Sequence, residues 1–358
     1  MLKARAAVRS LPAYHPPLGG REGLRLDFNE NTVGCSPRVL ARLRSIDPEQ
    51  LARYPEREPA ERAVADFLGV SPAGTLLTNG VDEAIHLVCE TYLEPGDEAL
   101  IVVPTFSMYR IYAAATGARV IEIPAGDDFR FPAGAVLARI TPRTRLIAVA
   151  NPNNPTGTFA ALEDLRRIAL AAPEAALLVD EAYFEFCGRT MLDFRGELPN
   201  LFVARTFSKA YGLAGLRIGV LIGDAGQMPL VRLAGSPYSV NAVALACLPD
   251  ALADQEYIRR YVDEVCAGRR LLEDTLRSLG VPHWQSQANF VLARFDLPQL
   301  PASMRRRGVL VRDRSSDYGC AGCVRMTLGP GPHTARLLGA LRESLQELGV
   351  AQPQGASR

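Results

Sequence analysis

Short apolar runs that alternate with helical stretches between residues 75 and 223 constrain the fold more than any other feature of the sequence. Most of these runs are apolar at successive positions instead of alternating. Such strands belong to a sheet that is covered on both faces. The pattern therefore predicts an α/β domain with a mostly parallel seven-stranded sheet covered by helices. The seven runs are residues 75–78, 99–103, 120–123, 146–150, 176–179, 201–203 and 218–222.

A change of pattern after residue 223 predicts a second unit. A long charged helix is expected at 255–279, followed by short strands and two helices typical of a small α+β domain. The irregular first 50 residues have too few periodic apolar positions to fold alone. We therefore expect an N-terminal segment (1–50) that packs on the large domain and the partner subunit, a large domain (51–250) and a small α+β domain (251–358). The small-domain strands are expected at 290–293, 309–311 and 324–327, and its helices at 301–307 and 334–348.

Charge and hydropathy exclude several classes of partner. Forty Lys and Arg residues against 39 Asp and Glu residues give a net charge of +1, so no net field attracts a polyanion. No apolar run is long enough to span a bilayer, and the N-terminus lacks the apolar segment of a secretory signal. We expect no nucleic-acid partner, no membrane partner and a cytoplasmic protein.

The seven cysteines show no spacing typical of a disulfide framework, so we expect reduced thiols. Cys320 and Cys323 form a C-x-x-C pair, but the chain has no second pair and His333 is the only histidine nearby. The four ligands of a zinc site cannot be assembled locally, and we expect no metal centre. The role of this pair stays open.

Polar side chains follow four of the expected strands, at their carboxyl ends. In α/β sheets the ligand site lies at this edge, so these side chains are candidates for the chemistry of the protein. Each one alone is better explained as a structural residue, such as a helix cap, a surface lysine or half of an ion pair. The residues are Asn154 in the 151–157 loop, Asp180, Tyr183, Ser208, Lys209 and Arg217, together with the turn at Gly80 that opens a helix.

Together these residues match the needs of pyridoxal phosphate. This cofactor requires an amine for a Schiff base, an anion beside its ring nitrogen and a cradle for its phosphate. Lys209 would supply the amine and Asp180 the anion. The helix start at residues 80–82, with Ser208 and Arg217, would supply the cradle, since helix N-termini and guanidinium groups bind phosphate.

Ordered motifs then link the chain to a known family. They include Leu-Asp-Phe-Asn-Glu-Asn at 26–31, Asn-Pro-Asn-Asn-Pro-Thr-Gly at 151–157 and Val-Arg-Met-Thr-Leu-Gly at 324–329. Over nearly its whole length the chain resembles the fold-type I, class II pyridoxal-phosphate-dependent aminotransferases, and specifically the histidinol-phosphate aminotransferase family. Further motifs of the resemblance lie at 54–55, 104–106, 179–183, 206–217 and 288–290.

The resemblance implies a role for each matching residue around the cofactor. Lys209 would be the Schiff-base lysine and proton shuttle, and Asp180 the partner of the pyridinium nitrogen. Asn154 and Tyr183 would hydrogen-bond the phenolic oxygen of the cofactor. Phe106 stands where the family commonly stacks a tyrosine on the pyridine ring, so stacking is kept and the hydroxyl is lost.

The resemblance also implies a homodimer whose active sites are shared between subunits. The cofactor phosphate would be held within one chain by Gly80, Val81, Asp82, Ser208 and Arg217. Tyr54 would reach this phosphate from the second subunit.

For the substrate, the resemblance points to Arg325 as the arginine that binds the carboxylate of the donor and the phosphate of the acceptor. Arg312 resembles a second anion-binding arginine, and Tyr14 an N-terminal tyrosine that closes over the substrate. Asn29 is a further candidate substrate contact. The segment at 29–37 departs from the family pattern, which leaves its conformation open.

The implied activity is transfer of an amino group between small molecules, from glutamate to imidazole acetol phosphate, giving histidinol phosphate and 2-oxoglutarate in histidine biosynthesis. Two alternatives keep the cofactor: an aromatic amino-acid aminotransferase and a threonine-phosphate decarboxylase-like enzyme. A third is a non-catalytic protein on the same scaffold. The intact set of Asn154, Asp180, Lys209 and Arg325 argues against this third alternative.

Overall fold

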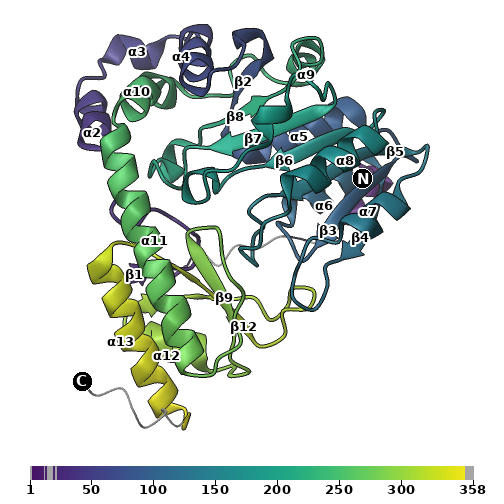
Figure 1. The fold of residues 1–358 in the computed structure, drawn as a ribbon. Coiled ribbons are helices and arrows are strands. Elements are labelled where there is room, and N and C mark those ends of the chain that lie inside the picture. Colours follow the sequence, from purple (N-terminus) through teal and green to yellow (C-terminus); the bar gives the residue numbers. More distant parts are fainter. Residues whose placement is uncertain (1, 12, 14–18, 21, 351–358) are drawn as a thin grey trace.

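The computed structural model describes residues 2–11, 13, 19–20 and 22–350 in two lobes. The upper lobe in Figure 1 contains the large sheet, and the lower lobe contains the C-terminal elements. The long helix α11 (Gln255–Ser278) runs from one lobe to the other. The predicted fold class, an α/β domain with a smaller α+β domain, is confirmed.

The large sheet has seven strands in the order β2-β8-β7-β6-β5-β3-β4. Six of them run in one direction, and β8 is antiparallel to both of its neighbours. The prediction of a mostly parallel sheet is therefore confirmed. The strands are β2 (Thr75–Thr78), β3 (Glu98–Val103), β4 (Arg119–Pro124), β5 (Thr144–Ala150), β6 (Ala176–Asp180), β7 (Leu201–Thr206) and β8 (Gly219–Ile222).

The central strands are apolar throughout because both faces of the sheet are covered. In β6, Leu177 and Val179 join one hydrophobic core, whereas Leu178 between them joins a second core on the opposite face. Side chains alternate between the faces of a strand, so a strand between two cores needs apolar residues at every position. The helices of this lobe and of the N-terminal segment are α1 (Ala6–Arg9), α2 (Pro37–Arg44), α3 (Pro48–Ala52), α4 (Glu58–Leu68), α5 (Gly80–Tyr92), α6 (Met108–Thr116), α7 (Ala133–Arg139), α8 (Leu162–Ala171), α9 (Met228–Ala234) and α10 (Ala242–Ala253).

The small lobe is built on an antiparallel sheet in the order β11-β12-β9. Its helices cover one face of that sheet (Figure 1). The expected boundary at residue 250 falls inside α10, so the chain leaves the large lobe at the end of this helix. The elements are β9 (Phe290–Arg294), β10 (Val309–Leu310), β11 (Arg312–Asp313), β12 (Cys323–Thr327), α12 (Leu300–Arg306) and α13 (Gly331–Glu347).

The N-terminal segment pairs with the small lobe, a contact that the sequence did not predict. Strand β1 (Leu24–Arg25) pairs in parallel with β10 of the small lobe. The Leu24 N–H donates to Gly308 O at 2.8 Å, and the Leu26 N–H donates to Leu310 O at 2.9 Å. These bonds satisfy the edge of β10, which would otherwise be left without partners. Residues 24–26 thus hold the segment against the small lobe.

Among the described residues, no helix combines the length and the apolar character that crossing a lipid bilayer requires.

Candidate functional site

A cavity of about 300 Å³ lies at the carboxyl edge of the large sheet. Strands β5, β6 and β7 end at it, and the N-terminal segment closes its other side. Nine predicted site residues line it: Val81, Asp82, Phe106, Asn154, Asp180, Tyr183, Ser208, Lys209 and Arg217. The remaining lining residues are Phe28, Glu30, Tyr109, Ala150, Pro152, Ala182, Thr206 and Ala214.

Lys209 is an amine held in a buried position just after β7. Its Nζ donates a hydrogen bond to Phe28 O at 3.2 Å. Burial lowers the pKa of Lys209 to about 8, because desolvation disfavours the charged ammonium group. An amine with this pKa is partly neutral near pH 7 and is therefore available as a nucleophile or a base. The sequence contains one other lysine, Lys3, whose side chain is exposed.

Asp180 is a buried carboxylate at the end of β6. The Tyr109 hydroxyl donates to its Oδ2 at 2.6 Å, and the Ala182 N–H donates to its Oδ1 at 2.9 Å. Burial nevertheless raises the pKa of Asp180 to about 6, because these two bonds only partly offset desolvation. A positively charged group bound beside this carboxylate would restore its ionised form.

A turn that fits an anion lies where β2 meets α5. Gly80 has φ +77°, and a Cβ at this position would lie 2.6 Å from Nη2 of Arg217. The glycine therefore lets the guanidinium lie against the first turn of α5. Arg217 itself binds Asp82 Oδ2 at 3.0 Å, and Ser208 Oγ accepts from Thr206 Oγ1 at 2.9 Å. The N–H groups of a helix start, a hydroxyl and a guanidinium form a typical phosphate site.

The opposite wall is a hydrogen-bonded network behind the lining residues. Arg325 donates through Nη1 to Asn154 Oδ1 and through Nη2 to Asp27 O at 2.6 Å. Burial lowers the pKa of Arg325 to about 10, and its Nε is buried without a hydrogen-bond partner. Asn29 donates through Nδ2 to the Tyr183 hydroxyl at 2.9 Å. Arg325 and Asn29 thus lie behind the cavity wall, each in contact with a lining residue, Asn154 and Tyr183 respectively.

Three predicted site residues either do not line this cavity or lie outside the described part of the chain. The Tyr54 side chain is 79% exposed, and its ring packs on Tyr238 with centroids 4.4 Å apart. Arg312 does not line the cavity, but its guanidinium carbon lies 5.4 Å from the centre of the Phe28 ring, which does. Tyr14 lies outside the described residues.

The structure gives the conformation of the 29–37 segment, which the sequence left open. The Asn31 side-chain oxygen accepts hydrogen bonds from the N–H groups of Val33 and Gly34, at 2.9 and 3.0 Å. Its Nδ2 donates to Ala210 O, next to Lys209, at 3.0 Å. The asparagine side chain thus forms the turn and attaches it to the loop that carries the lysine.

Four lining residues with polar or aromatic contacts were not predicted from the sequence: Phe28, Glu30, Tyr109 and Thr206. Tyr109 lies three residues after Phe106, and their rings meet edge to face with centroids 5.9 Å apart. Phe106 precedes α6 and Tyr109 lies in its first turn, so helical spacing alone did not indicate this contact. Phe28 and Glu30 lie in the family-like motif at 26–31, but nothing in their residue types indicates a contact with the cavity.

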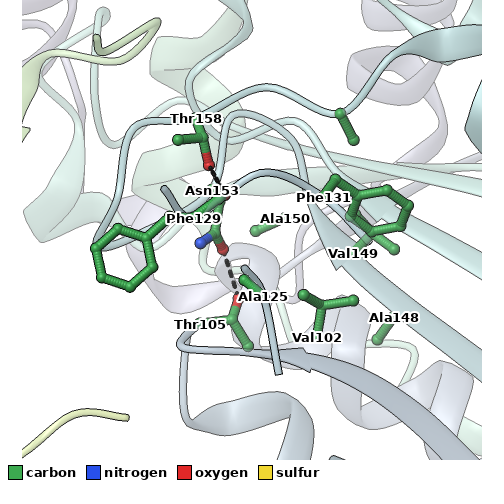
Figure 2. A pocket seen from close by; sticks show the side chains of 11 residues that line it. Val102, Thr105, Ala125, Phe129, Phe131, Ala148, Val149, Ala150, Asn153 and Thr158 are labelled. Carbon is green, nitrogen blue, oxygen red and sulfur yellow. Dashed lines mark hydrogen bonds between the residues drawn. The ribbon is translucent and has the colours of Figure 1, made fainter. Parts of the chain in front are cut away.

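A much smaller cavity lies under the 151–157 loop (Figure 2). Asn153 accepts from Thr105 Oγ1 at 2.7 Å (Figure 2). It also donates to Pro104 O at 2.9 Å. The space measures about 20 Å³, which is room for one water-sized molecule. It therefore belongs to the packing that holds the loop, and Asn154 next along the chain, in position.

Comparisons with known proteins identify the family of this chain. Residues 21–343 match the model of the family described as aminotransferase class I and II. The chain belongs to this family. It is 37% identical over 337 residues to a histidinol-phosphate aminotransferase of Paracoccus denitrificans, with 90% of each chain covered. It is 33% identical to the histidinol-phosphate aminotransferase of a Geobacillus species, covering 97% of this chain and 99% of the relative.

A solved structure supports the same fold. The histidinol-phosphate aminotransferase of Sinorhizobium meliloti, in complex with pyridoxal 5'-phosphate, superposes with a TM-score of 0.85 at 25% identity. The match covers 97% of this aminotransferase and 99% of the solved chain.

Proposed function

We propose that this aminotransferase works with pyridoxal phosphate held at the carboxyl edge of the large sheet. One observation carries the proposal: a buried lysine, a buried aspartate and an anion-binding turn all line a single cavity. The residues fit the group in three respects. Gly80 leaves the space that Arg217 fills, Lys209 supplies an amine of lowered pKa, and Asp180 is a carboxylate in need of a positive partner.

When bound, pyridoxal phosphate withdraws electrons from the α-carbon of an amino acid and so lowers the barrier to removal of its proton. The residues of the chain would supply the rest. Asp180 would hold a proton on the ring nitrogen, Lys209 Nζ would take and return the α-proton, and Phe106 would stack on the ring. Asn154 and Tyr183 would donate hydrogen bonds on the side of the cavity that faces Arg325. Val81, Asp82, Ser208 and Arg217 would anchor the phosphate.

We further propose that the acceptor is imidazole acetol phosphate, the donor glutamate and the product histidinol phosphate. The names of the related proteins support this substrate. So does the charge of the site, because Arg325 offers a buried guanidinium whose Nε has no partner. A planar guanidinium can bind either a carboxylate or a phosphate. It could therefore bind the carboxylate of glutamate and, in turn, the phosphate of imidazole acetol phosphate. Arg312, at the neighbouring position of the sheet, pairs with Arg325 in register and is the second anion-binding residue.

The substrate proposal is tested with purified enzyme and a panel of amino donors. Glutamate and histidinol phosphate should each convert the bound cofactor to its amine form, as followed by absorbance, and Lys209→Ala should abolish the conversion. Expression in a histidine auxotroph should restore growth. Faster conversion with phenylalanine or tyrosine than with histidinol phosphate, or release of CO₂ from threonine phosphate, would replace this substrate and leave the cofactor proposal standing.

We also propose a homodimer in which Tyr54 completes the site of the partner. The exposed Tyr54 ring, lying away from the cavity of its own chain, supports this assembly. Mixing Lys209→Ala with Tyr54→Ala after unfolding should give hybrids with one intact site. At random pairing about a quarter of the wild-type activity should return, since half of the dimers are hybrids with one of two sites intact.

The control for this hybrid uses the double variant Tyr54→Ala with Arg217→Ala. Arg217 acts in the same chain as Lys209, because both line one cavity. A hybrid of the double variant with Lys209→Ala therefore has no intact site and should stay inactive. Equal activities of the two mixtures, or a fully active monomer, would rule out a shared site.

A further inference from the structure

A pair of buried cysteines lies at the contact between the two lobes, away from the cavity. Cys320 and Cys323 are each 0% exposed and pack in one cluster with Leu292 and Phe129. Phe129 belongs to the large lobe and also lines the small cavity of Figure 2. The ring of Trp284 lies against it, with centroids 4.5 Å apart. The two thiols therefore lie where the small lobe meets the loop between β4 and α7.

The backbone brings the two cysteines within disulfide range. The Cys323 N–H donates to Cys320 O at 2.9 Å, and Gly322 between them has φ +69°. This is a hydrogen-bonded β-turn with a glycine at the position that requires positive φ. The first and last Cα atoms of such a turn lie within about 7 Å, which is the span that a disulfide bridges. The chain can form the bond by rotating the side chains within this turn.

The surroundings separate the two thiols chemically. A hydrogen bond from Cys320, with Arg294 beside it, lowers the pKa of the Cys323 thiol, whereas the same hydrogen bond and burial raise the pKa of Cys320. Arg294 also donates to Gly319 O at 3.1 Å and so is attached to this turn. Cys323 is thus the better nucleophile, and Cys320 retains its proton.

A metal site does not account for this pair. Within the described part of the chain, no group of three or more His, Cys, Asp or Glu side chains is placed to hold a metal ion. Two thiols alone do not complete the four ligands of a structural zinc site. Two thiols held this close together can react with one another to form a disulfide.

We propose that Cys320 and Cys323 form a reversible disulfide, with a peroxide as the oxidant. The Cys323 thiolate attacks one peroxide oxygen, the O–O bond breaks, and hydroxide leaves and takes up a proton to become water. Cys323 is then a sulfenic acid. The Cys320 sulfur attacks the Cys323 sulfur, the S–O bond breaks, and the departing oxygen leaves as water with the Cys320 proton. Two thiols and one hydrogen peroxide give one disulfide and two waters. A dithiol reductant reverses the bond by exchange.

The chain offers a direct mass test of this site. Trypsin cleaves after Arg314 and after Arg325, so residues 315–325 form one peptide that contains both cysteines. The enzyme with its cofactor bound is treated with hydrogen peroxide, quenched by alkylation and digested. We expect this peptide to be unalkylated and two hydrogens lighter than its reduced form, and we expect dithiothreitol to restore both alkylation sites.

A second readout comes from Trp284, which is the only tryptophan of the chain. Its ring packs beside the cluster that contains both sulfurs. Disulfide formation should therefore change its fluorescence at the same rate as the mass shift. Cys320→Ser should stop the reaction at the sulfenic acid, which dimedone captures at Cys323. Cys247→Ser, which removes a fully buried thiol of the large lobe, should leave the mass shift unchanged.

Other results would overturn the proposal. If peroxide oxidises other cysteines while Cys320 and Cys323 both remain open to alkylation, the pair does not react with peroxide. Sulfinic acid at either residue without a disulfide would mean that the sulfurs do not meet. The wild-type mass map decides the question by itself if a serine variant does not fold.

Discussion

The two walls of the cavity differ in how the fold positions their side chains. On the large-lobe wall, Asp180 is the last residue of β6 and Lys209 lies in the loop just after β7, so the strands place both directly. On the opposite wall, Arg325 and Asn29 act through contacts with Asn154 and Tyr183. The first wall depends on sheet topology, whereas the second forms only when four separate chain segments meet. We therefore expect loss of chemistry from changes to the first wall and graded loss of binding from changes to the second.

Lys209→Ala should have the largest effect. It removes both the covalent attachment of the cofactor and the base, so kcat should fall by at least about 10⁴-fold. After borohydride reduction, mass spectrometry should find the cofactor attached to the peptide that contains Lys209 in the wild type. It should find no attached cofactor in the variant.

Lys3→Ala is the matched control, because Lys3 is the only other lysine of the chain. This variant should keep wild-type turnover and labelling. Labelling at Lys3 in the wild type would show that the buried amine is not the attachment point.

Asp180→Asn should have the next largest effect, with kcat lowered by roughly 10²-fold or more if the lost stabilisation is about 3 kcal/mol. An amide cannot hold the ring proton of the cofactor, although Tyr109 and the Ala182 N–H still position it. Cofactor affinity should change less than turnover. Unchanged kcat would make this aspartate a structural residue only.

The same variant should change the stability of the cofactor-free protein in a pH-dependent way. Burial raises the pKa of Asp180 from its ordinary value of 3.8 to about 6, so the native state binds more protons than the unfolded state between these values. Its contribution to stability is therefore lost as pH rises through this window, by roughly 3 kcal/mol. At pH 7 the Asp180→Asn variant should unfold at a higher temperature than the wild type, and near pH 4 the two should agree. The exposed Asp128→Asn should show no such difference.

Arg325→Lys should mainly weaken binding, which sets the second wall apart from the first. The change removes the planar guanidinium that contacts Asn154 and Asp27 O. The loss of a charge-assisted hydrogen bond, about 1.5–3 kcal/mol, should raise KM for glutamate by roughly ten- to a hundredfold. Arg312→Lys, on the adjacent strand, should raise it less. A larger fall in kcat than rise in KM for Arg325→Lys would remove the distinction between the walls.

The difference between the walls also explains what the sequence could predict. Continuous apolar runs end at Asp180 and lead into Ser208 and Lys209, so strand pattern and residue type indicated the first wall. The pairing of β1 with β10 joins residues nearly 300 positions apart and depends on the edge of a two-residue strand, which has no local signal. Arg325 was found only through resemblance to a family. Its hydrogen bond to Asn154 depends on how the lobes meet.

Tyr109→Phe should have the smallest effect and tests whether the first wall extends beyond the residues at strand ends. The Tyr109 hydroxyl donates to Asp180 at 2.6 Å, and this bond lowers the pKa of Asp180 against the effect of burial. Without the bond the carboxylate is less stable in its charged form, so kcat should fall about tenfold, or roughly 1.4 kcal/mol, with KM for glutamate unchanged.

A role limited to packing would not change titration, so the pH dependence of cofactor-free stability decides whether Tyr109 acts through Asp180. In the wild type the free energy of unfolding falls as pH rises, up to the pKa of Asp180 near 6. Because this pKa rises further in the variant, the pH at the upper end of that range should move upward. Tyr112→Phe is the control, since Tyr112 lies on the same helix but stacks on His86 outside the cavity. Tyr112→Phe should leave both kcat and this pH unchanged. If Tyr109→Phe lowers kcat without moving this pH, the hydroxyl does not act through Asp180, and the first wall consists of the strand-end residues alone.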